Sequence, residues 1–117
     1  MEVETKMEKW LLVAESNCSD PAREEEFNHW YNTIHVPDVL ETPGILRGTR
    51  FKNDEPPEGH GKYLAIYEVE TEDIQQTIST FGEIITERWK QGRWSELLAP
   101  DLYVAFFKQM APPIESK

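Results

Sequence analysis

The sequence has a single cysteine, Cys18, among its 117 residues, which excludes an intrachain disulfide and favours a reducing compartment. No apolar run approaches the ~20 residues that a membrane-spanning helix needs. The first residues also lack the basic stretch and the apolar stretch that together form a secretory signal. These absences predict a cytoplasmic protein that is not associated with a membrane.

Basic residues are scarce. Lysine and arginine total 12 against 22 aspartates and glutamates, which gives a formal net charge of −10. Such an acidic chain is a poor candidate for binding the phosphate backbone of nucleic acid. The sequence has no glycine-rich phosphate loop, and its 3 histidines and single cysteine are too scattered for a zinc site. We therefore expect no cofactor and no metal site.

Aromatic residues are plentiful, and the apolar residues recur with periods typical of four strands and two helices. The predicted strands cover residues 10–14, 45–52, 63–69 and 102–110. The predicted helices carry apolar stripes at Phe27, Trp30, Tyr31 and Ile34, and at Ile74, Ile78, Phe81, Ile85 and Trp89. Residues 9–110 form one predicted domain between a flexible N-terminus (1–8) and a flexible C-terminal tail (111–117).

Local signals mark where the helices begin and end. Asp20 followed by Pro21 is typical of an N-cap and a first helical residue. Pro37 predicts a kink or a stop, because it lacks the N–H that would bond the Thr33 carbonyl. Thr71 is the expected N-cap of the second helix, and Gly92 its expected end.

The order β-α-β-β-α-β predicts an α+β, ferredoxin-like fold, with a four-stranded antiparallel sheet and both helices on one face. Alternate residues of the strands are apolar on both sides of the sheet; Leu11 and Leu12 exemplify this in the first strand, and Phe106 and Phe107 in the last. A sheet with two apolar faces and helices on one must bury its second face. We therefore expect a homodimer that forms through the sheet.

The stretch from Glu26 to Leu40, with the pattern W-Y-x3-H-x-P-x-V-L, is followed by the turn Thr42-Pro43-Gly44 and by Gly48-Thr49-Arg50-Phe51. In these residues and in the order of its elements the chain resembles the dimeric α+β barrel superfamily. It is most similar to small bacterial proteins of the EthD (ethyl tert-butyl ether degradation) type. The resemblance implies two ferredoxin-like protomers packed sheet to sheet.

The resemblance leaves the function open, because the superfamily includes cyclases, isomerases, cofactor-free monooxygenases and haem-degrading enzymes. The first hypothesis is a cofactor-independent enzyme that acts on a small aromatic or polyketide-like ligand in a cleft between helix and sheet. The second is a non-catalytic protein that binds a small molecule, or a partner, in the same cleft. The third is a haem-binding or haem-degrading protein.

His35 and Tyr31 are the candidate catalytic residues. Histidine exchanges a proton near neutral pH, and relatives of known activity commonly place a histidine in this cleft. Tyr31 lies one helical turn earlier and could orient an oxygen of the ligand. The alternative for His35 is a structural role, in which it holds the Pro37 kink through a hydrogen bond to the Thr33 carbonyl or another backbone acceptor.

Five aromatic residues are expected to line the cleft as ligand-binding residues: Trp30, Phe51, Tyr67, Trp89 and Trp94. Packing within the core is the alternative for each of them. Arg47 and Arg50 lie on opposite faces of their strand, and the sequence leaves open which face carries which. The buried one would pair with a carboxylate such as Glu15 or Glu68, or else bind an anionic ligand.

Overall fold

Four strands and three helices, with tighter or wider turns beside the helices, make up the computed structural model, which describes residues 6–117. The strands are β1 (Glu8–Ser16), β2 (Ile45–Lys52), β3 (Tyr63–Thr71) and β4 (Tyr103–Lys108). The helices are α1 (Glu24–Trp30), α2 (Val36–Val39) and α3 (Ile74–Arg88). The turns are η1 (Pro21–Arg23), η2 (Tyr31–His35) and η3 (Trp89–Arg93).

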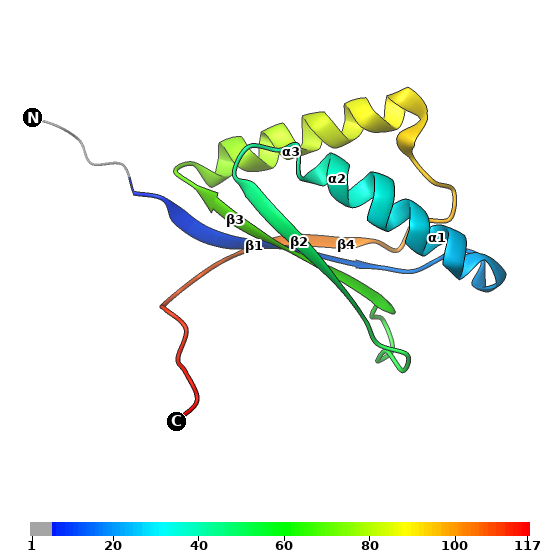
Figure 1. Ribbon diagram of the computed structural model, residues 1–117, viewed down its shortest axis with the longest axis horizontal. Coiled ribbons are helices and arrows are strands. Elements are labelled where there is room, and N and C mark those ends of the chain that lie inside the picture. Colours follow the sequence, from blue (N-terminus) through cyan, green and yellow to red (C-terminus); the bar gives the residue numbers. More distant parts are fainter. Residues whose placement is uncertain (1–5) are drawn as a thin grey trace, which may run out of the picture.

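The strands form one sheet in the order β2-β3-β1-β4, with every neighbouring pair antiparallel. The first helix (α1, η2 and α2) and α3 both lie on one face of this sheet, and the opposite face carries no helix (Figure 1). This is the ferredoxin-like α+β fold that the sequence predicts. Between residues 6 and 117 there is no helix long and apolar enough to span a membrane.

The buried core lies between the sheet and the helices. Leu12 of β1 faces Tyr67 of β3 on one side and Phe106 of β4 on the other. Leu12 and Tyr67 are each only 1% exposed, and Phe27 of α1 is fully buried above the sheet. Alternate side chains of a strand point to opposite faces, so Leu11 and Phe107 must point away from the helices.

The face without helices exposes several apolar side chains. Leu11, Phe51, Tyr103 and Phe107 lie on it, and about half of each of the three aromatic side chains is accessible. The predicted two-sided apolar sheet is therefore confirmed. A patch of this kind is typical of an interface rather than of a surface that stays in water.

Among the signals for helix ends, Asp20 and Gly92 act as predicted, and Thr71 does not. The Asp20 side chain accepts a hydrogen bond from the Ala22 amide at 3.0 Å, and the chain turns back after Gly92, which has a φ of 83°. The N-cap of α3 is Asp73 rather than Thr71, because Thr71 is still the last residue of β3. Asp73 accepts from the Gln76 amide at 3.2 Å.

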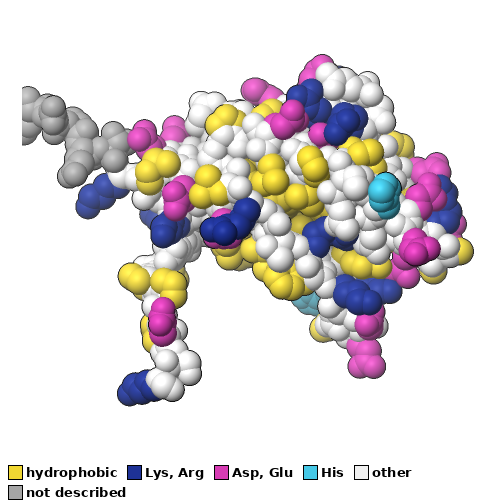
Figure 2. Space-filling model, in the orientation of Figure 1, with side chains coloured by type: hydrophobic (Ala, Val, Ile, Leu, Met, Phe, Trp, Pro, Cys, Tyr) yellow, Lys and Arg dark blue, Asp and Glu magenta, His cyan; other side chains and the backbone are white. Residues whose placement is uncertain are grey.

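The two chain ends differ in what the structure describes. The predicted flexible N-terminus, 1–8, falls mostly on residues outside the described range, and Glu8 already belongs to β1. Residues 111–117 form no helix or strand and extend away from the sheet (Figures 1 and 2). Their apolar side chains, such as Ile114, stand exposed.

Candidate functional site

A π-helical turn positions the two candidate catalytic residues. Within η2 the amide of Val36 donates to the carbonyl of Tyr31, five residues earlier, instead of four. Pro37 has no N–H to donate, and the wider turn lets the helix continue through it as α2. The predicted stop at Pro37 is therefore wrong, because the helix continues to Val39. The irregularity that the proline causes is a π-bulge just before it.

His35 lies in an aromatic enclosure. Its ring stacks on Trp30, with centroids 5.1 Å apart and an interplanar angle of 18°. Tyr31 meets it edge to face at 4.8 Å, and the ring of Trp89 lies at 6.3 Å. The His35 Nδ1 atom is buried and has no hydrogen-bond partner among residues 6–117, so the predicted tie to the Thr33 carbonyl is not seen there.

Burial lowers the pKa of His35 to about 4, because the apolar surroundings disfavour the charged imidazolium. The carboxylate of Asp38 opposes this shift, while the nearby Arg50 adds to it. At neutral pH the His35 ring is therefore uncharged. One of its two nitrogens then carries a proton, and the other can accept one.

Tyr31 and Tyr67 fill the space between the first helix and the sheet, and each is only 1% exposed. Burial raises the pKa of both hydroxyls, so both phenols stay protonated at neutral pH. The Tyr67 ring lies over Gly48 of the neighbouring strand, where a Cβ atom would come within 2.6 Å of the ring. A protonated Tyr31 can donate a hydrogen bond, which fits the orienting role predicted for it.

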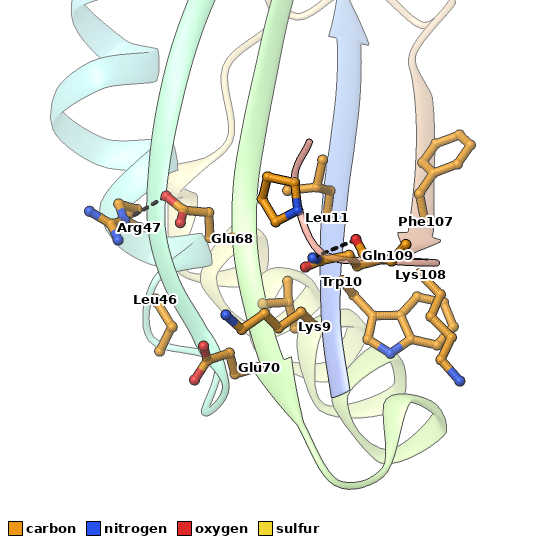
Figure 3. A pocket seen from close by; sticks show the side chains of 13 residues that line it. Lys9, Trp10, Leu11, Leu46, Arg47, Glu68, Glu70, Phe107, Lys108 and Gln109 are labelled. Carbon is orange, nitrogen blue, oxygen red and sulfur yellow. Dashed lines mark hydrogen bonds and ion pairs between the residues drawn. The ribbon is translucent and has the colours of Figure 1, made fainter. Parts of the chain in front are cut away.

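Arg50 reaches into the same region from β2. Its guanidinium lies 4.1 Å from the centroid of the Tyr31 ring, and its Nη1 donates to Asn32 Oδ1 at 3.0 Å. Burial lowers the pKa of this arginine. Arg47 lies exposed on the opposite face and pairs there with Glu68 (Figure 3), whereas Arg50, the buried arginine, does not form the predicted ion pair with any carboxylate of residues 6–117.

The structure brings together most, but not all, of the predicted ligand-binding residues. Trp30, Tyr67 and Trp89 lie around Tyr31 and His35. Trp94 is half exposed and borders a shallow hollow of about 370 Å³ beside Trp30, on the outer surface. The Trp30 indole donates to the carbonyl of Arg93 at 2.9 Å, which fixes this corner.

The placement of Phe51 in the cleft is wrong. Ile45 is buried beneath the helices, and strict alternation from it would turn Phe51 inward as well. The register of β2 against β3 shifts between Ile45 and Arg47, as in a β-bulge, and this reverses the alternation. Gly48 and Arg50 therefore face the helices, and Phe51 lies on the open face opposite Leu64.

The hollows described in the structure also lie outside the predicted cleft. One of about 580 Å³ lies on the open face of the sheet, between Leu11, Leu46, Glu68 and Phe107 (Figure 3). A second, of about 390 Å³, lies on the same face near Phe51. The expected pocket near Pro37 is occupied by protein side chains, chiefly the rings of Tyr31 and Tyr67.

Sequence reasoning missed two polar features of this region. Asp38 is 4% exposed and accepts hydrogen bonds from Nε and Nη2 of Arg93, which ties the end of the first helix to η3. Asn32 fixes Arg50 from one turn of the helix. Asn28 and Asn32 are polar residues at a helical spacing beside the apolar stripe, and this pattern could have indicated the contact between Asn32 and Arg50. The sequence carried no signal for the first, because its residues are 55 positions apart. No group of three or more metal-ligating side chains occurs in the range 6–117.

The fold of the chain is similar to that of known structures. A dimeric ferredoxin-like protein of unknown function from Thermobifida fusca YX has a TM-score of 0.58 at 10% identity, over 92% of this chain and 97% of that one. An EthD family protein from Bacillus halodurans C-125 has a TM-score of 0.54 at 18% identity, over 88% and 99%. A monooxygenase from Streptomyces coelicolor, in complex with nanaomycin D, has a TM-score of 0.56 at 16% identity, over 94% of each chain.

These similarities establish a ferredoxin-like α+β fold, which the EthD family protein from Bacillus halodurans also has. Residues 16–115 match the family described as Domain of unknown function (DUF4286), and the chain belongs to that family. No curated protein sequence matches the chain. At these low identities the solved structures establish the fold alone.

Proposed function

We propose that this protein is a cofactor-independent enzyme that moves a proton on a small, flat aromatic ligand held between its first helix and its sheet. The observation that carries the proposal is His35: an uncharged imidazole enclosed by aromatic rings, with a buried Nδ1 that has no partner among the described residues. A neutral imidazole can accept a proton and so act as a general base. Aromatic walls suit a flat ligand.

The reaction class follows from the groups present. His35 takes a proton from an acidic C–H or O–H group of the ligand and becomes an imidazolium. Tyr31 donates a hydrogen bond to the ligand oxygen on which negative charge develops. The imidazolium then returns the proton to a different atom, so that the net change is an isomerisation or a ring closure. No oxidant or reductant is consumed.

A ligand can enter only if the first helix moves away from the sheet, because the side chains of Tyr31 and Tyr67 fill the space between them. We place this opening at η2, where the helix has a π-bulge and where Pro37 supplies no backbone donor. A π-bulge and a missing hydrogen bond weaken the helix locally. The first helix can therefore shift from the sheet there at less cost than elsewhere along its length.

Deuterium exchange tests the proposal directly. β-Tetralone is a flat ketone with an acidic C–H group, and NMR in deuterium oxide follows the loss of that proton. We expect the protein to accelerate the exchange and His35→Gln to lower the acceleration by about 100-fold, the usual contribution of a general base. His29→Gln, on the exposed side of the same helix, is the matched control and should exchange like the wild type.

The same experiment separates the proposal from its alternative. If β-tetralone binds, as judged by quenching of tryptophan fluorescence, but its exchange is not accelerated, a non-catalytic binding protein is the better description. If exchange is accelerated equally by the wild type and by His35→Gln, the assignment of His35 is wrong. Circular dichroism should show that both variants are folded.

We also propose that the protein is a homodimer that forms through the open face of its sheet. The exposed Leu11, Phe51, Tyr103 and Phe107 support this, because a second copy would bury them. The Thermobifida fusca neighbour, described as dimeric, has the same fold. The helix-covered site lies on the other side of the sheet and is complete within one protomer.

A further inference from the structure

Arg50 is a partly buried arginine of β2 on the face of the sheet that the helices cover. The register places it opposite Ala65, on the covered side of the sheet. Its guanidinium lies over the ring of Tyr31 at 4.1 Å and near that of Tyr63 at 5.3 Å. Asn32 accepts a hydrogen bond from Nη1 and fixes the orientation of the head group.

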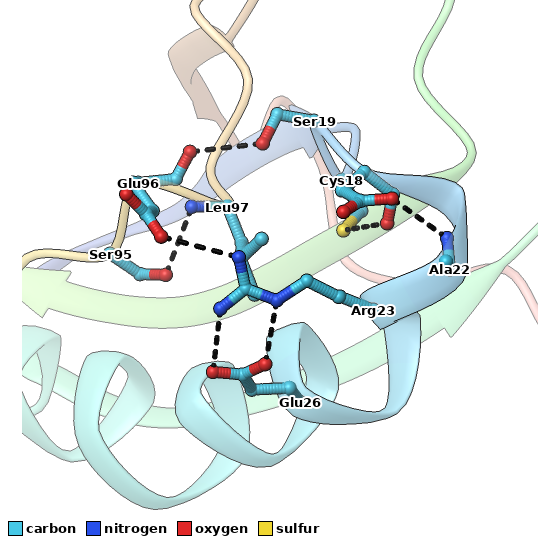
Figure 4. Close-up of polar contacts among 9 residues, drawn as sticks. Cys18, Ser19, Ala22, Arg23, Glu26, Ser95, Glu96 and Leu97 are labelled. Atoms are coloured by element: carbon cyan, nitrogen blue, oxygen red, sulfur yellow. Dashed lines mark hydrogen bonds and ion pairs between the residues drawn. The ribbon is translucent and has the colours of Figure 1, made fainter.

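Three other arginines of this protein show what such a head group binds. Arg23 donates to Glu26 from Nε and Nη2, both at 2.9 Å (Figure 4). Arg88 donates from the same two nitrogens to Glu41, at 2.6 and 2.9 Å. Arg93 does so to Asp38, with a bond of 2.8 Å from each nitrogen. In each case the Nε–Nη2 edge of the guanidinium matches the two oxygens of a carboxylate.

The corresponding edge of Arg50 has no such partner among residues 6–117. Its Nε and Nη2 atoms are buried and donate to no described atom. Contact with the face of Tyr31 does not replace these bonds, because the N–H groups of a guanidinium lie in its plane and not above it. The two carboxylates that the sequence suggests as partners of the buried arginine contact other residues: Glu68 pairs with Arg47, and Glu15 contacts His60.

Buried polar groups of proteins are almost always hydrogen-bonded, and a buried charge needs a partner of opposite charge. The Nε–Nη2 edge of Arg50 is positively charged, buried and held in orientation by Asn32. It is therefore suited to bind an anion that is not part of the chain. The site is next to Tyr31, and Arg50 is close enough to His35 and Tyr67 to influence their pKa values. A ligand in the proposed cleft would therefore meet it.

We propose that Arg50 binds the carboxylate of the ligand through its Nε–Nη2 edge, so that the ligands of this protein are flat aromatic carboxylic acids. This inference rests on the proposed function for the location of the aromatic part of the ligand, but not for the carboxylate contact itself. Arg50 is then a specificity-determining residue: it selects acids over neutral molecules of the same shape.

Calorimetric titration with a matched pair of probes tests this. β-Naphthoate carries a carboxylate, and β-naphthamide has nearly the same shape without the charge. We expect the wild type to bind the naphthoate at least about tenfold more tightly, as is usual for a charge-assisted two-bond contact. Arg50→Gln should remove this preference and leave the affinity for the amide unchanged within about twofold.

Two further variants make the test specific. Arg50→Lys should restore only part of the preference, because an ammonium group lacks the two-donor fork. Arg47→Gln removes an arginine from the same strand but from the open face, and should behave as the wild type does. An Arg50→Gln variant that still prefers the naphthoate overturns the inference, and so does a wild type that binds both probes equally.

An independent signal keeps the inference testable if Arg50→Gln does not fold. The NMR resonance of the Arg50 Nε–H group should shift when benzoate is added to the wild-type protein, and should not shift with the same concentration of chloride. If neither the naphthalene probes nor benzoate act on Arg50, the inference is wrong. The exchange of β-tetralone, which has no carboxylate, tests the proposed function separately.

Discussion

Mild acidification should destabilise this protein through His35. The pKa of this residue is lowered from 6.5 to about 4 in the folded chain. Since the unfolded chain takes up the proton first, stability is complete above the unfolded pKa and is lost as the pH falls toward the folded one. The full difference corresponds to about 3 kcal/mol, of which about 2 kcal/mol is lost between about pH 7.5 and pH 5.

Other groups contribute little in this pH range. Basic partners lower the pKa values of several glutamates below 4.5, and these glutamates are Glu8, Glu24, Glu26 and Glu41. Their contributions to stability are lost only at lower pH, since a carboxylate with a lowered pKa is protonated below its ordinary range. His35 therefore accounts for most of the slope above about pH 5.

The assay is urea unfolding at several pH values, followed by tryptophan fluorescence at one fixed protein concentration, because an oligomer is stabilised by concentration. His35→Phe keeps an aromatic ring against Trp30 but cannot be protonated, so its stability should be nearly flat over the range. His29→Gln should retain the slope of the wild type. If the wild type and His35→Phe lose the same stability on acidification, His35 is not buried as an uncharged ring, and the general-base assignment fails with it.

Two further predictions concern the sheet. Phe107→Glu on the open face should convert the proposed dimer to a monomer, as measured by sedimentation at micromolar concentration. Ile78→Glu on α3 is the control and should leave the dimer intact. A wild type that is already monomeric would contradict the proposed interface. Gly48→Ala should lower the free energy of unfolding by about 1–3 kcal/mol, because its Cβ would press on the Tyr67 ring. Gly82→Ala is the control, at an exposed helix position with open space around it, and should raise the free energy of unfolding by about 0.5–1 kcal/mol. Equal effects of the two substitutions in urea unfolding would refute the close packing at Gly48.

The sequence predicted the fold because its signals are local. Helices and strands impose periods of 3.6 and 2 residues on the apolar side chains, and those periods can be read without knowing any contact. The stripe from Phe27 to Ile34 and the alternation from Trp10 to Ala14 both correspond to elements of the structure. The boundaries are harder to predict, as Thr71 shows, because Thr71 and Asp73 lie two residues apart and either type of residue can cap a helix.

The candidate site was only partly predictable. Trp30, Tyr31 and His35 share one helical stretch, so their proximity follows from the helical period. Tyr67 and Trp89 come from distant parts of the chain, and the sequence could suggest but not establish that they meet the others. Phe51 was misplaced because a single irregularity near Ile45 reverses the alternation of β2, and no local signal marked it.

The sequence by itself determined the order of the elements, the apolar character of both sheet faces and the uncompensated negative charge, because each depends only on composition and on short-range periodicity. The tertiary structure alone decided which arginine is buried and with what partners. Arg47 and Arg50 are equally able to pair with a carboxylate, and only the register of β2 against β3 places Glu68 beside the first and aromatic rings beside the second. Contacts between distant residues depend on register and packing, and these are properties of the folded chain as a whole.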